Sequence, residues 1–119
     1  MKPFESIQQV FAIVFKGLQS QQFRQSRDPG VGCLYRHNDL KCAAGHLIPD
    51  DLYDQHMENQ GFADLCEAFP DVQQLIPTDE LQNFTAKLQS IHDSNTNPKE
   101  MEHDLRILAR QHDLTVPLP

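Results

Sequence analysis

The chain has 119 residues, of which 39% are hydrophobic and 23% are charged, and its formal net charge at pH 7 is -7. This length predicts a single domain, 1–119, with one hydrophobic core, because domains commonly span about 50–200 residues. No apolar run approaches the roughly 18 residues of a membrane span, so the sequence argues against a membrane protein. The most apolar stretch, residues 10–15, is too short for a secretion signal. We therefore expect a protein of the cytoplasm.

The first predicted helix extends from residue 3 to about residue 25. Its apolar side chains are Phe4, Ile7, Phe11, Val14 and Leu18. They recur every three or four residues, which is the period of a helix with one buried face. Pro3 suits the first turn, where a missing N–H leaves no hydrogen bond unmade. The sequence Asp28-Pro29-Gly30 favours a turn after the helix.

Residues 31–49 show no helical period. Residues 31–35 favour a short strand, and residues 41–48 favour one or two helical turns. These turns should end at Pro49, because the residue before a proline is pushed out of the helical region. Residues 37–39 have the composition of a turn. We predict an irregular segment that packs against the first helix and contains Cys33 and Cys42. Segments of this kind often carry function.

Helix signals return after Pro49. Short helices are predicted over residues 49 to about 57 and 62 to 69, with one or two turns over residues 72–76. Two longer helices follow, capped by Thr78 and Asn97, and the first of them ends near Ser94. Their inner faces carry Leu81, Phe84, Leu88 and Ile91 in the first, and Met101, Leu105, Leu108 and His112 in the second.

The predicted fold class is therefore all-α (mainly α), as a single compact domain of about five helices around a short irregular segment that contains cysteines. The apolar faces of the first helix and the last two helices need one another for burial. Residues 115–119 are predicted to form an extended tail. Of the histidines in the last two helices, we expect His92 and His103 in solvent and His112 as the best candidate for a buried ring.

The cysteines offer the first candidate chemistry. An odd number of them, Cys33, Cys42 and Cys66, predicts reduced thiols that pack as small apolar groups. The spacing Cys33-x3-His37 followed by Cys42-x3-His46 also provides a Cys2His2 set, which zinc accepts in tetrahedral sites. No cofactor is expected on the first interpretation, and zinc is the alternative.

A thiol nucleophile is a further alternative. Spacing by four residues would place Cys42 and His46 on one face of a helix, and His46 or His56 could act as the base. Asp50 or Asp51 would then be the carboxylate that orients the base. The three acidic residues Asp50, Asp51 and Asp54 do not match a calcium-binding loop, because the loop glycine and terminal Glu are missing.

Charge is divided unevenly along the chain. Residues 1–50 carry six Lys or Arg and four acidic residues, whereas residues 51–119 carry four and thirteen. No Lys or Arg lies between Lys41 and Lys87, where nine acidic residues occur: Asp50, Asp51, Asp54, Glu58, Asp64, Glu67, Asp71, Asp79 and Glu80. This argues against direct nucleic-acid binding, which depends on Lys and Arg. It favours a protein partner with a basic surface, while a solvated helical surface is the simpler alternative.

A central motif resembles a known group of proteins. Residues 33–36 read Cys-Leu-Tyr-Arg, and residues 41–53 read Lys-Cys-Ala-Ala-Gly-His-Leu-Ile-Pro-Asp-Asp-Leu-Tyr. Together they resemble the C-x-Y-R and K-C-A-x-G-x-L-I-P-D-x-x-Y segments of small phage and prophage proteins. The resemblance covers residues 33–58 and does not require His at positions 37 and 46.

The resemblance implies a phage or mobile-element origin, and hence the cytoplasm of a host cell, but no substrate or catalytic role. It also implies a structural nucleus formed by Cys33, Arg36, Cys42, Gly45, Asp50 and Tyr53. The leading hypothesis is a small acidic, phage-like interaction protein that binds and inhibits a host or defence-system component through an acidic surface. The alternatives are a metal-binding or thiol-dependent enzyme centred on Cys33, Cys42 and His46, and a phage structural or assembly accessory. The sequence leaves the oligomeric state open.

Overall fold

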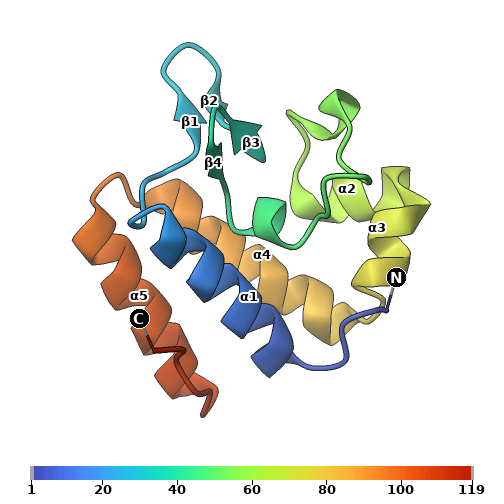
Figure 1. The fold of residues 1–119 in the computed structure, drawn as a ribbon. Helices are drawn as coiled ribbons and strands as arrows, with labels where there is room; N and C mark the ends of the chain where they lie inside the picture. The colour runs from blue at the N-terminus through green and yellow to red at the C-terminus, as the bar shows by residue number, and fades with distance from the viewer. Residues whose placement is uncertain (1, 119) are drawn as a thin grey trace.

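Two long helices, α1 (Ile7–Ser20) and α4 (Asp79–Ser94), pack against each other at the centre of the fold (Figure 1). The structure is a computed structural model that describes residues 2–118, so Met1 and Pro119 of the predicted domain lie outside the described residues. Ser6 caps α1 by accepting a hydrogen bond from the Gln9 N–H, and Thr78 caps α4 by accepting one from the Leu81 N–H. Helices make up 54% of the residues and strands 7%, which confirms the predicted mainly α fold.

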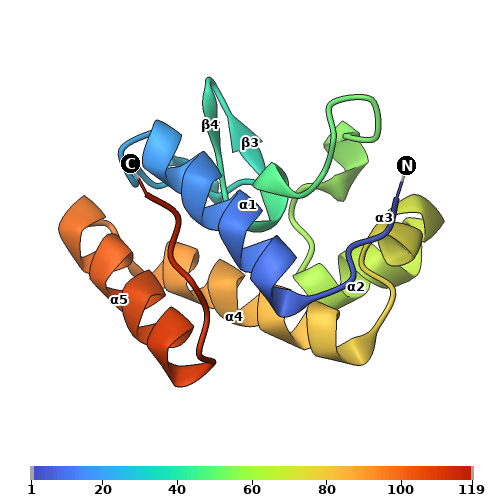
Figure 2. The same ribbon diagram turned by 60° about the horizontal axis from the view of Figure 1, so that its bottom comes forward.

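The last helix, α5 (Pro98–Gln111), packs against α4 and buries Met101, Leu105 and Leu108, as predicted. The Asn97 side chain caps α5 by accepting hydrogen bonds from two backbone N–H groups. The chain after α5 returns along α1 (Figure 2). There the Gln8 amide donates to the Thr115 carbonyl at 2.9 Å and accepts from the Thr115 N–H at 2.8 Å. These two hydrogen bonds hold the tail against the first helix.

Two short helices, α2 (Phe62–Ala68) and α3 (Pro70–Leu75), form the other end of the molecule (Figure 1). Phe69 ends α2 and begins α3, and α2 packs against both α3 and α4. The Phe4 N–H donates to the Leu75 carbonyl at 2.9 Å, which ties the N-terminal segment to the end of α3. Among the described residues, no helix is both long and apolar enough to cross a membrane.

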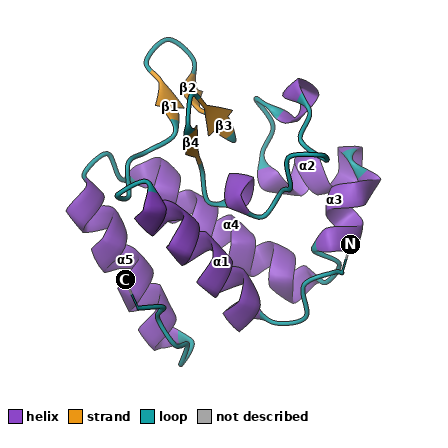
Figure 3. Ribbon diagram, viewed as in Figure 1, coloured by secondary structure: helices purple, strands orange, loops and turns teal. Residues whose placement is uncertain are grey.

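Two small hairpins occupy the irregular segment (Figure 3). Strand β1 (Arg27–Asp28) pairs antiparallel with β2 (Gly32–Cys33), and Arg27 lies opposite Cys33. Strand β3 (Arg36–His37) pairs with β4 (Leu40–Lys41) across the predicted turn. Two 3-10 helices follow, η1 (Ala44–His46) and η2 (Gln55–Met57).

Three local expectations were wrong. The first helix begins at Ile7 because Ser6 caps it, and it ends at Ser20 because Gln22 and Phe23 adopt positive φ. The strand expected over residues 31–35 is shorter: Gly32–Cys33 forms β2, and residues 34–35 connect the two hairpins. The helix expected over residues 49–57 is a turn followed by η2, because Asp54 in an extended conformation caps a new start at Gln55.

Two glycines mark close approaches in the core. A Cβ at Gly45 would collide with the Tyr35 carbonyl oxygen, and a Cβ at Gly17 would collide with the His46 ring. The first approach holds η1 against the segment between the hairpins, and the second holds η1 against α1. Gly45 thus has a packing role that accounts for its place in the motif.

We expect Gly45→Ala to lower the free energy of unfolding by about 1–3 kcal/mol, the usual cost of forcing an extra methyl into packed structure. The measurement is urea denaturation followed by circular dichroism. Gly61→Ala is the matched control, since its Cβ would meet only the Asp64 carboxylate at 4.0 Å. Equal stability of the two variants would contradict the packing role assigned to Gly45.

Candidate functional site

The motif residues form a hydrogen-bonded network around the Glu58 carboxylate. This carboxylate accepts hydrogen bonds from the backbone N–H groups of Tyr35, at 2.8 Å, and Arg36, at 3.1 Å. It also accepts a hydrogen bond from the Tyr53 hydroxyl at 2.6 Å. Burial and this hydrogen bond raise the pKa of Tyr53 to about 12. One acidic side chain therefore joins the hairpin region to residues 53–58.

Arg36 completes this network from the other side. Its guanidinium lies 4.5 Å from the Tyr53 ring centroid, donates to the Ile48 carbonyl at 2.8 Å and pairs with Asp50 at 2.7 Å. The Lys41 ammonium is 3.5 Å from the same Asp50 oxygen. The hydrogen bond from Arg36 holds the pKa of Asp50 below its usual range. Arg36 and Lys41 thus share Asp50, and this ion pair lies at the surface, where such pairs contribute little stability.

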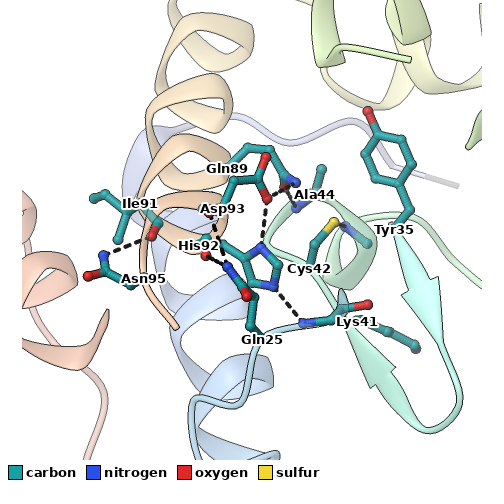
Figure 4. Close-up of polar contacts among 12 residues, drawn as sticks. Gln25, Tyr35, Lys41, Cys42, Ala44, Gln89, Ile91, His92, Asp93 and Asn95 are labelled. Carbon is teal, nitrogen blue, oxygen red and sulfur yellow. Dashed lines mark hydrogen bonds and ion pairs between the residues drawn. The ribbon is translucent and has the colours of Figure 1, made fainter. Parts of the chain in front are cut away.

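A second network surrounds His92, whose ring is fully buried on α4 (Figure 4). The Ser26 backbone N–H donates to Nε2 at 2.9 Å, and Nδ1 lies 2.8 Å from the Asp93 carboxylate. Because Nε2 accepts a hydrogen bond, the neutral ring carries its proton on Nδ1 and donates it to Asp93. The expectation of a solvated His92 was therefore wrong.

Neighbouring amides complete the surroundings of His92. The Gln25 amide donates to the His92 carbonyl at 3.0 Å, and the Gln89 amide donates to the Asp93 carboxylate at 3.1 Å (Figure 4). The Gln89 carbonyl oxygen accepts the Ala44 N–H at 2.9 Å. Sequence reasoning missed these glutamines and His92. The helical period could have found His92, since it follows the buried Leu88 by four residues.

The predicted zinc ligands are not brought together. Within residues 2–118, the metal-ligating side chains that do converge are Cys33, His92 and Asp93, with donor atoms within 4.8 Å of one another. His37 instead contacts Asn38, and the His46 ring packs against Gly17. The expected set of Cys33, His37, Cys42 and His46 therefore has no counterpart in the described part of the chain.

The converging set is also poorly suited to a metal. A metal ion at His92 Nδ1 would move the ring proton to Nε2, where it would face the Ser26 N–H. Without His92 only Cys33 and Asp93 remain, whereas structural zinc takes four ligands. The arrangement favours a hydrogen-bonded support for the fold over a metal centre.

The thiols are held in their protonated form. Burial and the Asp93 carboxylate raise the pKa of Cys33 to about 11, and burial raises the pKa of Cys42 to about 12. The Cys42 sulfur accepts the Gly45 N–H at 3.3 Å and is fully buried. Cys33 lines a pocket of about 240 Å³, together with Tyr35 and Asp93. Because the thiolate is the reactive form, this site does not favour a thiol nucleophile.

His46 is a partly buried ring that stays neutral at pH 7. Its Nε2 donates to the Gln21 side-chain oxygen Oε1 at 3.0 Å, and Oε1 also accepts a hydrogen bond from the Lys41 N–H. The Gln21 amide donates to the Arg24 and Lys41 carbonyls. Burial, followed by the charge of Lys41, lowers the pKa of His46 to about 4. The ring therefore links η1 to the end of α1, and its Nε2 is engaged in that hydrogen bond.

The nine predicted acidic residues differ in their surroundings. Glu58 is committed to its network, Asp50 is paired, and Asp54 caps η2 and contacts His56 at 2.7 Å. Asp51 is exposed in the turn before η2. The remaining five, here called the acidic end, are Asp64, Glu67, Asp71, Asp79 and Glu80. They are exposed on α2, α3 and the first turn of α4, and none has an ion pair within the described residues.

We expect acid to destabilise the protein through His46. Above about pH 6.5 the ring is neutral in both states and contributes no pH dependence. Between about pH 6.5 and about pH 4 the unfolded chain binds a proton that the folded ring resists, so the free energy of unfolding falls by up to about 1.4 kcal/mol per pH unit. Urea denaturation at about pH 7 and about pH 5 measures this slope.

His46→Gln should flatten that slope, whereas the exposed His103→Gln should retain it. An unchanged slope in His46→Gln would show that the pH dependence arises elsewhere.

We expect His92→Leu to lower the free energy of unfolding by about 2 kcal/mol or more, because it leaves the buried Ser26 N–H without an acceptor. His103→Leu, on the exposed side of α5, should change it by less than about 0.5 kcal/mol. Thermal denaturation of both variants tests this. Stoichiometric zinc in the purified wild type that is lost in Cys33→Ser would instead show that the cluster is a metal centre.

No family model, curated protein or solved structure matches this chain. The phage-like resemblance of residues 33–58 therefore stays a prediction. The Glu58 carboxylate and the His92 ring already have hydrogen-bond partners, so the exposed charged and apolar surface is the better guide to function.

Proposed function

We propose that this protein binds a partner protein through its acidic end and that the partner's surface is basic. The observation that carries this proposal is the exposure of five acidic residues at one end of the fold without an ion pair among the described residues. A surface of one sign attracts a partner of opposite charge, and it speeds association more than it raises affinity.

The fold supports this proposal by gathering the acidic residues. Helix α2 packs against both α3 and α4, so the segments that carry the five residues are neighbours (Figure 1). No Lys or Arg occurs between residues 42 and 86 to neutralise them from within these segments. Their charge is therefore available to a partner, and it would repel the phosphates of a nucleic acid.

The resemblance to phage proteins makes the proposal more specific. A small acidic protein of this origin would bind a host or defence-system component and compete for the basic surface with which that component contacts nucleic acid. Inhibition would then follow from occupancy of that surface alone. The protonated thiols and the engaged histidines give no comparable support to an enzyme.

We expect the triple variant Asp64→Asn, Glu67→Gln and Asp71→Asn to bind the partner about tenfold more weakly and to associate more slowly. The three side chains are exposed, so the circular dichroism spectrum should stay helical. The difference from wild type should shrink toward 1 M salt, where the Debye length is about 3 Å. The measurement is capture of the partner from native host cells, followed by binding kinetics at several salt concentrations.

The matched control is Glu5→Gln, Glu100→Gln and Asp113→Asn, which changes the net charge equally through exposed residues outside the acidic end. This control should keep the wild-type association rate to within about twofold. Equal, salt-insensitive binding by the wild type and both triple variants would overturn the proposal.

A further inference from the structure

A groove lies beside the acidic end. It has a volume of about 530 Å³ and is lined by Pro3, Leu52, Asp71, Gln74, Leu75 and Pro77. Four of these six residues are apolar, and one, Asp71, belongs to the acidic end. The volume falls within the range of about 300–1,000 Å³ that is typical of ligand pockets.

The groove is built from three separate segments that hydrogen bonds hold in place. The Phe4 N–H donates to the Leu75 carbonyl at 2.9 Å and so fixes the N-terminal segment beside α3. The Leu52 N–H donates to the Pro49 carbonyl at 3.0 Å in the turn that carries Leu52. A groove that is already formed spares an incoming segment part of the cost of ordering its site.

Charge around the groove indicates what it would bind. Asp71 lies in the lining, Asp51 precedes Leu52, and Asp79 follows Pro77 by two residues, all of them exposed. Lys2, next to Pro3, is the one basic residue that adjoins a lining residue in the sequence. A mainly apolar lining, with exposed acidic residues in it and next to it in the sequence, fits a segment that has apolar side chains and flanking positive charges.

We infer that this groove docks a segment of the partner protein that carries two or three apolar side chains bracketed by Lys or Arg. This inference rests on the proposed function and adds to it the part of the partner that is recognised. The apolar side chains would enter between Leu52, Leu75 and Pro77. The basic side chains would reach Asp71 and the other exposed acidic residues near the lining. Charge would then guide the encounter, and burial of apolar surface would hold the complex.

The test uses synthetic 14-residue probe peptides and the isotope-labelled full chain. The first probe is an amphipathic helix of Leu and Lys, the second replaces each Leu by Ser, and the third replaces each Lys by Glu. We expect the Leu/Lys probe to shift the amide resonances of Leu52, Gln74 and Leu75 and to bind about tenfold or more tightly than the Ser/Lys probe. The Leu/Glu probe should not bind.

Two variants on α3 separate the groove from general charge. Gln74→Arg places a basic side chain in the groove, whereas Gln73→Arg makes the same charge change at an exposed neighbour outside the lining. Gln73 makes only an exposed hydrogen bond to Gln82, so both variants should fold. Gln74→Arg should lower the affinity for the Leu/Lys probe about tenfold, and Gln73→Arg should lower it less than about threefold.

Two results together would overturn the inference about the groove: equal affinity for the Leu/Lys and Ser/Lys probes, and an equal loss of affinity in Gln74→Arg and Gln73→Arg. The acidic end would then remain as a charge-based binding surface. Failure of every Lys-containing probe to bind would overturn both proposals. Resonances at the groove that shift with protein concentration alone would show that a second copy of the chain is the occupant, and would also overturn the inference.

Discussion

The buried ring of His92 constrains much of the structure around it. An imidazole shut away from water needs a partner at each nitrogen, and here the partners are the Ser26 backbone and the Asp93 carboxylate. The first of these fixes the chain just before β1 against α4, and the second aligns Asp93 with Gln89, which in turn holds η1 through Ala44. The chain just before β1 and the start of η1 are thus both held against the end of α4 by contacts of His92 and its neighbours.

Some polar side chains of this chain hold the fold together, whereas others stay exposed at its surface. Glu58, Gln21 and His92 each hydrogen-bond to residues from distant parts of the chain, so polar side chains help to hold the irregular segment in place. The motif residues Arg36, Gly45 and Tyr53 take part in the same support. The five residues of the acidic end make no such contacts, so their carboxylates remain exposed.

The sequence predicted the long helices well because their signals are local. Thr78, Asn97 and the apolar period that follows each of them are visible within a few residues. Glu58 was assigned to the acidic surface because nothing near it in the sequence shows that two backbone N–H groups more than twenty residues away would face it. The positions of the two-residue strands were not predicted for the same reason, since they depend on pairing partners that only the folded chain supplies.

The pairing of α1 with α4 also has a consequence for synthesis. The apolar face of α1 is complete at Ser20, but its main partner is not complete until Ser94. At about 5–20 residues per second, the ribosome leaves this face uncovered for roughly 4–15 s. Until α4 emerges, Val10, Phe11 and Phe15 lack a main part of the packing that buries them in the folded protein, so the nascent chain exposes apolar surface that favours aggregation.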